Sequence, residues 1–152
     1  MNEDEIFEVG GSKSFKPTIA IVILTLNEEI NIERCILSVN WADEIIVLDS
    51  GSNDRTTSIA NKHGIKSYIH IQEKPFRISE QRNYALDNCN LSSDWILFID
   101  ADEIITKELE REIKFTLLSN LEFNAYSLTP KYIYLGKWLK LTQGYPNWQI
   151  GL

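Results

Sequence analysis

Apolar segments that read as buried strands recur along the first hundred residues of the chain. Thr18–Leu26 is an almost continuous run of apolar and β-branched residues, which is typical of a buried strand. Trp95–Ile99 is unbroken in its apolar character, as expected for a central parallel strand that is covered on both faces. Glu44–Leu48 and the weaker Ile65–Ile69 are predicted strands between these two.

Helical patterns separate the predicted strands. Asn27 is a favourable N-cap residue, and apolar residues follow it at helical spacing. These apolar residues are Ile32, Cys35, Ile36 and Val39. Further helices are predicted over Thr56–His63, Ser79–Cys89 and Thr106–Leu118. Strands that alternate with helices predict an α/β fold, with a doubly wound, mostly parallel sheet and helices on both faces.

The last 30 residues differ in character from the rest. Residues 123–152 hold seven aromatic residues and three lysines but no Asp, Glu or His. Ala125–Leu135 and Lys137–Leu141 are aromatic, β-prone segments with no helix between them, and we expect them to pack on the edge of the sheet. The predicted organisation is a flexible leader over residues 1–16, an α/β domain over 17–122 and an aromatic, β-rich segment over 123–152.

Composition and charge narrow the class of protein. The net charge of −7 argues against a nucleic-acid binder, which needs a basic face. The longest apolar runs fall far short of the roughly 20 residues that span a bilayer. The acidic N-terminus lacks the apolar core of a signal peptide. Cys35 and Cys89 lie in predicted helices and are expected to be buried, reduced thiols, which indicates a cytoplasmic protein.

Polar residues cluster after three of the predicted strands, where ligands of open parallel sheets bind. Thr25, Asn27 and Glu28 follow the first strand, Asp49 follows the second, and Asp100 and Asp102 follow the fourth. Carboxylates brought to one edge of a sheet repel one another unless a cation lies among them, and their oxygens select Mg²⁺ or Mn²⁺. A turn or capping role would explain a single carboxylate, such as Asp54, but not the whole set.

The sequence has no glycine-rich loop that could bind the phosphates of a nucleotide, so other residues would have to bind them. Neither the dinucleotide-binding pattern nor the phosphate-loop pattern occurs after the first strand. Arg82, near the start of the helix predicted over Ser79–Cys89, is the best basic candidate for a diphosphate contact. The competing interpretation is a solvated arginine on a helix face.

Four segments at strand and helix ends point to a known family. They are Ile19–Glu29, Val47–Asp54, Gln81–Ala85 and Phe98–Glu103. In this order and spacing they resemble the family 2 glycosyltransferases, which have the Rossmann-like GT-A fold. The segments Tyr134–Trp138 and Gly144–Pro146 further resemble a bacterial subgroup that adds glucose to the lipopolysaccharide inner core.

The resemblance implies an inverting transfer of a sugar from a UDP-sugar to a glycan or lipid-linked acceptor, with Mg²⁺ or Mn²⁺. The residues that it implies in nucleotide-sugar binding are Thr25, Asn27, Glu28, Asp49, Arg82 and Asp100. Among these, Asp49 would accept a hydrogen bond from the base, which favours uracil. Asp102 would bind the metal directly, with Asp100 on its metal and ribose side.

The acceptor side of such an enzyme is less complete in this sequence. An inverting enzyme needs a general base, which in the family is an acid beyond the aromatic segment. Residues 123–152 contain none, so we expect the base to lie beyond Leu152 and this chain to bind UDP-sugar but transfer poorly. Lys131, Lys137 and Lys140 would lie near a lipid-linked acceptor or the inner face of the cell membrane. An uncovered apolar face there would favour self-association.

Two other functions use the same residues. A phosphatase of the haloacid dehalogenase type also has Asp-x-Asp after a strand, but after the first core strand rather than the fourth. A nucleotide-sugar-binding module without turnover would share every donor-site residue. Turnover alone separates this module from the enzyme.

Overall fold

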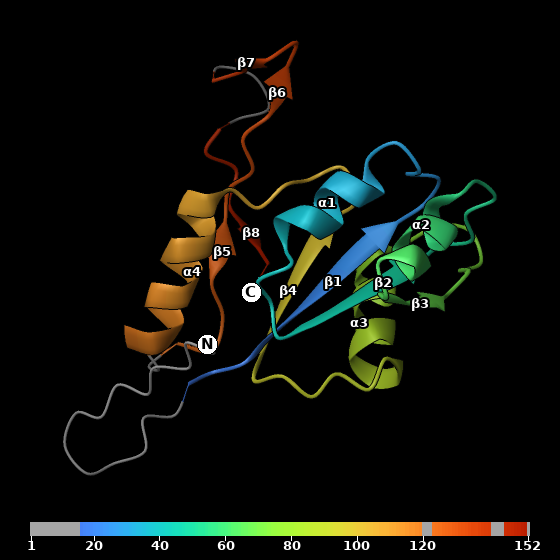
Figure 1. Ribbon diagram of the computed structural model, residues 1–152, viewed down its shortest axis with the longest axis horizontal. Helices are drawn as coiled ribbons and strands as arrows, with labels where there is room; N and C mark the ends of the chain where they lie inside the picture. The colour runs from blue at the N-terminus through green and yellow to red at the C-terminus, as the bar shows by residue number, and fades with distance from the viewer. Residues whose placement is uncertain (1–15, 120–122, 141–144, 152) are drawn as a thin grey trace, which may run out of the picture.

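The computed structural model describes residues 16–119, 123–140 and 145–151, and its centre is a four-stranded parallel sheet (Figure 1). The strands are β1 (Ile19–Thr25), β2 (Glu44–Asp49), β3 (Lys66–Ile69) and β4 (Trp95–Asp100). Their order is β3-β2-β1-β4, with every neighbouring pair parallel. The winding reverses at β1, so the predicted doubly wound α/β sheet is confirmed. Residues 1–15 of the predicted leader lie outside the described residues.

Helices cover both faces of the sheet, as the sequence predicts (Figure 1). They are α1 (Ile32–Ser38), α2 (Thr56–Lys62), α3 (Ile78–Asn88) and α4 (Lys107–Ser119). Ile21 and Ile23 of β1 belong to a core cluster with residues of α1, α2 and α4, whereas Val22 and Leu24 belong to a second cluster with residues of α3. Side chains alternate between the faces of a strand, so β1 is buried along its whole length.

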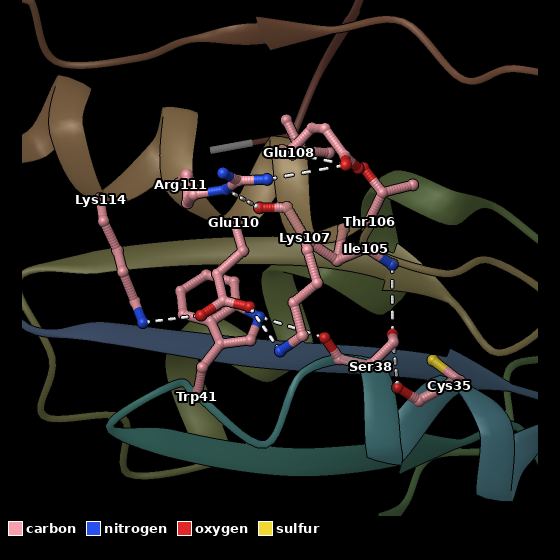
Figure 2. Close-up of polar contacts among 11 residues, drawn as sticks. Cys35, Ser38, Trp41, Ile105, Thr106, Lys107, Glu108, Glu110, Arg111 and Lys114 are labelled. Atoms are coloured by element: carbon pink, nitrogen blue, oxygen red, sulfur yellow. Dashed lines mark hydrogen bonds and ion pairs between the residues drawn. The ribbon is translucent and has the colours of Figure 1, made fainter.

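Polar contacts around Ser38 hold the segment that follows β4 against the end of α1 (Figure 2). The Ser38 hydroxyl donates to the Cys35 carbonyl at 2.7 Å and accepts from the Ile105 amide at 3.1 Å. The Trp41 indole donates to the Ser38 carbonyl at 3.1 Å, and the Lys114 ammonium lies 5.1 Å from the Trp41 ring centroid. Because Ile105 ends the loop after β4, these contacts fix the path of the loop that carries Asp-x-Asp.

The aromatic segment forms short strands rather than long ones. β5 (Ser127–Leu128) pairs antiparallel with β8 (Gln149–Ile150), and β6 (Ile133–Tyr134) pairs antiparallel with β7 (Lys137–Trp138). The β-prone segments predicted over Ala125–Leu135 and Lys137–Leu141 thus form strands of only two residues each, and Leu141 lies outside the described residues. Pro130 lacks a backbone donor and lies between β5 and β6, which limits pairing there.

The expected packing of this segment on the sheet edge is confirmed for its β5–β8 part. The Phe98 amide of β4 donates to the Gly151 carbonyl at 2.9 Å, and the rings of Trp95 and Tyr126 lie 5.5 Å apart. The β6–β7 hairpin instead projects away from the sheet (Figure 1). Its turn residues Leu135 and Gly136 both have positive φ, of 48° and 74°, as two-residue hairpin turns require.

Both cysteines are buried and neither forms a disulfide, as predicted. Burial, with a smaller effect of the nearby Glu103 charge, raises the pKa of the Cys35 thiol to about 12. The thiol is therefore protonated at neutral pH. Within the described residues, no helix has the length and apolar character needed to cross a membrane.

Candidate functional site

A cavity of about 370 Å³ opens where β1 and β4 end, beside the start of the loop that follows β2. Its lining residues are Leu24, Thr25, Leu26, Glu28, Ser50, Phe76, Ile78, Gln81, Asp100, Ala101 and Asp102. The strand register places Thr25 beside Asp49 and Leu24 beside Asp100, so the three strands end at one level. The cavity lies at the reversal of the winding, where doubly wound sheets bind their ligands.

Four of the predicted site residues line this cavity: Thr25, Glu28, Asp100 and Asp102. Thr25 is 5% exposed, and its buried hydroxyl oxygen has no hydrogen-bond partner among the described residues. Buried polar atoms in folded proteins are almost always paired. Thr25 therefore carries a polar group that the described residues leave unsatisfied beside the cavity.

Carboxylates crowd the β4 side of the cavity. Burial raises the pKa of Asp100, the charge of Asp102 raises it further, and the Arg82 guanidinium opposes both. Burial also raises the pKa of Glu103, whose carboxylate accepts a hydrogen bond from the Asp100 amide at 3.0 Å. A cation at this position would relieve the repulsion, so the chemistry of the residues fits a divalent metal.

The described residues do not hold a metal by themselves. Among them, no group of three or more His, Cys, Asp or Glu side chains converges on a point. Mg²⁺ is commonly bound through one or two carboxylates together with water and substrate phosphates. The Asp100 and Asp102 carboxylates therefore fit a metal that is shared with a phosphate-bearing ligand.

Arg82 lies on α3, close to these carboxylates but outside the residues that line the cavity. Its guanidinium carbon is 5.4 Å from the centroid of the Phe98 ring of β4. Its charge lowers the pKa values of Asp100 and Glu103 against the effect of burial. The side chain therefore already balances part of the negative charge of the site.

Asp49 lies beneath the cavity wall rather than in it. The residue is 1% exposed, and its Oδ1 accepts hydrogen bonds from the amides of Gly51 at 2.8 Å and Ser52 at 2.7 Å. Its Oδ2 accepts from the Ser52 hydroxyl. The carboxylate thus holds the turn after β2, where Gly51 has a φ of 100° that favours glycine. Contact between Asp49 and a base stays a prediction.

The prediction that Asn27 caps the next helix is wrong. Helix α1 begins at Ile32 with Asn31 at the N-cap position. Asn27 has a φ of 55°; its amide donates to Ser52 Oγ at 2.7 Å, and its side-chain oxygen accepts from the Asn53 amide at 2.9 Å. Asparagine tolerates this backbone conformation better than most residues. Asn27 therefore joins the loops that follow β1 and β2.

Residues at the start of α2 add further contacts between the loops that follow β1 and β2. The Asp54 carboxylate accepts from the Thr56 amide at 2.9 Å, so Asp54 has the turn role considered for it, although Arg55 occupies the N-cap position of α2. The Thr56 hydroxyl in turn accepts from the Glu28 amide at 2.8 Å. Glu28 is thereby held at the edge of the cavity by the same residues that begin α2.

Sequence reasoning missed Ser50, Phe76, Ile78 and Gln81 as lining residues. Phe76 and Ile78 are 56% and 45% exposed and come from the loop before α3 and its first residue. Their apolar character gave no chemical signal in the sequence. Gln81 stands beside Arg82 in a segment that the sequence analysis singled out, and its position one residue earlier was the available signal.

Comparisons with known proteins agree on a family. The sequence model described as glycosyl transferase family 2 matches residues 20–127. An uncharacterised glycosyltransferase of Rickettsia conorii is 41% identical over 111 residues, which are 72% of this chain and 37% of that protein. The lipopolysaccharide core biosynthesis glycosyltransferase LpsC of Rhizobium meliloti is 35% identical over 106 residues, which are 68% of this chain and 38% of that protein.

Solved structures give the same result. Glucosyl-3-phosphoglycerate synthase from Mycobacterium tuberculosis, in complex with Mn²⁺ and UDP-glucose, matches with a TM-score of 0.56 and 34% identity. The match covers 69% of this chain and 40% of that one. The chain thus spans about 40% of the length of these relatives. The matched segment, residues 20–127, contains the sheet and the cavity at its edge, and on this basis the chain belongs to glycosyl transferase family 2.

Proposed function

We propose that this chain forms the donor site of a metal-dependent glycosyltransferase that moves a sugar from a UDP-sugar to a saccharide or lipid-linked saccharide, with inversion. The observation that carries the proposal is the cavity at the winding reversal, with Asp100 and Asp102 on one side and the unpaired Thr25 hydroxyl in its wall. Relatives that were solved with UDP, UDP-glucose and Mn²⁺ or Mg²⁺ support the choice of ligand class.

In this proposal Asp102, with Asp100, holds Mg²⁺ or Mn²⁺ against the donor diphosphate. The metal would neutralise the charge that grows on the diphosphate as the bond to the sugar breaks. Thr25 and Glu28 line the cavity and would contact the nucleoside. Arg82 would oppose the effect of burial on the pKa of Asp100 and would steer the diphosphate.

Asn27 and Asp49 have supporting roles in the proposed site. Asn27 ties the β1 loop to the β2 loop through Ser52 and Asn53, and Asp49 holds the turn that presents Ser50 to the cavity. Such contacts keep a binding site in one geometry before the ligand arrives, which lowers the entropic cost of binding. Substitution of either residue would therefore weaken binding through the loops.

The phosphatase alternative is not favoured, because Asp100 and Asp102 follow β4 and because the family match is to glycosyltransferases. A binding module without turnover shares the proposed donor site. A transfer assay with UDP-glucose and a saccharide acceptor distinguishes the two. Release of UDP that depends on the acceptor supports the enzyme, whereas binding without release supports the module.

For the acceptor side, we propose that the β6–β7 hairpin faces an anionic or lipid-linked saccharide. Tyr134 and Leu135 at its tip are 65% and 85% exposed. The ammonium groups of Lys131 and Lys140 lie 5.0 and 4.7 Å from the centroid of the Trp138 ring. Co-sedimentation with vesicles that contain an anionic lipid tests this surface. Binding to neutral and anionic vesicles alike, or to neither, counts against it.

Calorimetric titration of UDP tests the donor site. With Mn²⁺ present we expect binding, and with EDTA we expect its loss. Asp102→Asn should weaken the metal-dependent binding by at least about tenfold, as loss of a metal contact does. The matched control Asp87→Asn removes an exposed carboxylate of α3 that does not line the cavity, and should leave binding unchanged. Equal binding by both variants would refute the assignment of Asp102.

A further inference from the structure

Glu103 closes the turn that carries the Asp-x-Asp residues. Its carboxylate Oε2 accepts a hydrogen bond from the Asp100 amide at 3.0 Å, and its own amide donates to the Asp100 carbonyl at 2.9 Å. Hydrogen bonds in both directions therefore join the first and last residues of the turn, with Ala101 and Asp102 between them. Asp102 stands at the corner of this turn and is exposed. The place of its carboxylate thus depends on the contacts that keep the turn closed.

The rest of the protein holds this turn from the side of β1 and α1. The Ala101 amide donates to the Leu24 carbonyl of β1 at 3.0 Å, and Ala101 is buried. The Cys35 thiol of α1 donates weakly to the Asp100 carbonyl at 3.8 Å. These contacts fix the inner side of the turn, which leaves the outer side to be held by another group.

The Asp100 amide faces that outer side, at the edge of the sheet. Alternate amides of a strand point the same way, and the Phe98 amide donates away from β1 to the Gly151 carbonyl at 2.9 Å. In the described part of the chain, β8 ends at Ile150 and no strand pairs with Asp100 on this side. The Glu103 carboxylate therefore supplies the acceptor that a further strand would supply.

Other roles do not explain a third acidic residue at this place. Like charges repel, so a carboxylate beside Asp100 and Asp102 is unfavourable unless a specific contact compensates for it. Helix α4 begins only at Lys107, so Glu103 lies outside its first turn and does not cap it. Among the described residues, no three acidic, histidine or cysteine side chains converge as a set of metal ligands. The hydrogen bond to the Asp100 amide is the contact that remains.

We propose that Glu103 is the positioning residue of the metal site, and that its carboxylate holds the turn so that Asp100 and Asp102 face one Mg²⁺ or Mn²⁺ ion. The inference rests on the proposed donor site and deepens it. Glu103 binds the Asp100 amide rather than the metal. Substitution of residues that hold metal ligands in place typically lowers metal affinity by about 10–100-fold.

Calorimetric titration of UDP at a series of Mn²⁺ concentrations tests this role, because it gives the Mn²⁺ concentration that half-saturates binding. Glu103→Ala removes the acceptor and should raise that concentration by about tenfold. The matched control Glu112→Ala removes an exposed carboxylate of α4 that does not line the cavity, and should leave the concentration unchanged. Urea unfolding of each variant checks that the titrated protein is folded.

Two further variants separate the hydrogen bond of Glu103 from its charge. Glu103→Gln keeps an acceptor oxygen at the same reach, so its Mn²⁺ affinity should stay within about threefold of the wild type. Glu103→Asp keeps the charge but is one methylene shorter, which withdraws the carboxylate from the amide. Its Mn²⁺ affinity should therefore fall below that of Glu103→Gln, an order that general loosening of the fold would not produce. Where Glu103→Ala does not fold, this order decides.

The outcomes separate this proposal from the donor site on which it rests. Wild-type Mn²⁺ dependence in Glu103→Ala, or an affinity of Glu103→Asp equal to or above that of Glu103→Gln, would overturn the positioning role. In either case metal-dependent binding of UDP by the wild-type chain upholds the donor site. Absence of any metal-dependent UDP binding by the wild type would overturn the donor site and the role of Glu103 with it.

Discussion

At the scale of single residues, the site combines groups that meet a ligand with groups that hold those groups in place. Asp102 and Thr25 line the cavity, whereas Asp49 lies under the turn that leads into it. Sequence alone ranked all three as ligand contacts, because carboxylates and hydroxyls at strand ends look alike in a sequence. The structure distinguishes these three residues by their burial and by the hydrogen bonds that their side-chain oxygens accept.

Asp49→Ala should lower the free energy of unfolding by about 1–3 kcal/mol, because the Gly51 and Ser52 amides would lose a charged acceptor. Urea unfolding of the variant and of the wild type measures the difference. Asp87→Ala, which removes an exposed carboxylate of α3, is the control and should change stability by less than about 0.5 kcal/mol. Equal stability of the two variants would contradict the role of Asp49 in the turn.

Cys35 should resist alkylation in the folded chain. Its side chain is fully buried and its pKa is raised to about 12 by burial, so the reactive thiolate is scarce and shielded. Iodoacetamide labelling followed by mass spectrometry should show modification of Cys35 in urea but not in buffer. Rapid modification under native conditions would show that the packing of α1 on the sheet is wrong.

At the scale of elements, hydrogen bonds between distant segments hold the loops and strand ends in place. Ser38 at the end of α1 fixes the end of the Asp-x-Asp loop through Ile105, and the Thr18–Asp94 pair joins the starts of β1 and β4. Neither contact could be read from the sequence, because each joins segments more than 60 residues apart. The strands and helices themselves were predictable, since their apolar periodicity is local.

Ser38→Ala should cost about 1 kcal/mol of the free energy of unfolding, the value of a hydrogen bond to a buried amide. Ser58→Ala is a matched control, because Ser58 also donates to the carbonyl three residues earlier but accepts from no described residue. The difference between the two variants in urea unfolding isolates the contact with Ile105. A difference of zero would mean that the α4 packing alone holds the loop.

The Thr18–Asp94 pair predicts a pH dependence of stability. Hydrogen bonds from the Thr18 amide and hydroxyl, both at 2.8 Å, lower the pKa of Asp94 below its ordinary value of 3.8. A carboxyl whose pKa is depressed by folding stabilises the fold above its unfolded pKa and loses that effect as pH falls through the folded pKa. Thermal melting of Asp94→Asn should lie below that of the wild type at neutral pH, and the gap should close in acid. A gap that persists in acid would exclude Asp94 ionisation as its cause.

At the scale of the whole molecule, the parallel sheet, its helices on both faces and the edge that binds ligands were predictable from the sequence. The aromatic segment was predictable only in part: its packing on the edge of the sheet was expected, but the extent of its short strands depends on contacts between distant residues, such as the Phe98–Gly151 hydrogen bond. Ser50 and Gln81 were not assigned to the cavity, since their place in its wall depends on how α3 packs beside the end of β2. The sequence showed which carboxylates follow the strands, and the structure showed how they are arranged around one cavity.

A crystal structure of the chain grown with UDP and Mn²⁺ is the most direct test of the proposed donor site. We expect the metal on the Asp102 carboxylate, the diphosphate beside it and the nucleoside against Thr25 and Glu28. Nucleotide bound away from the ends of β1 and β4, or a metal with no contact to Asp102 or Asp100, would contradict the proposed donor site.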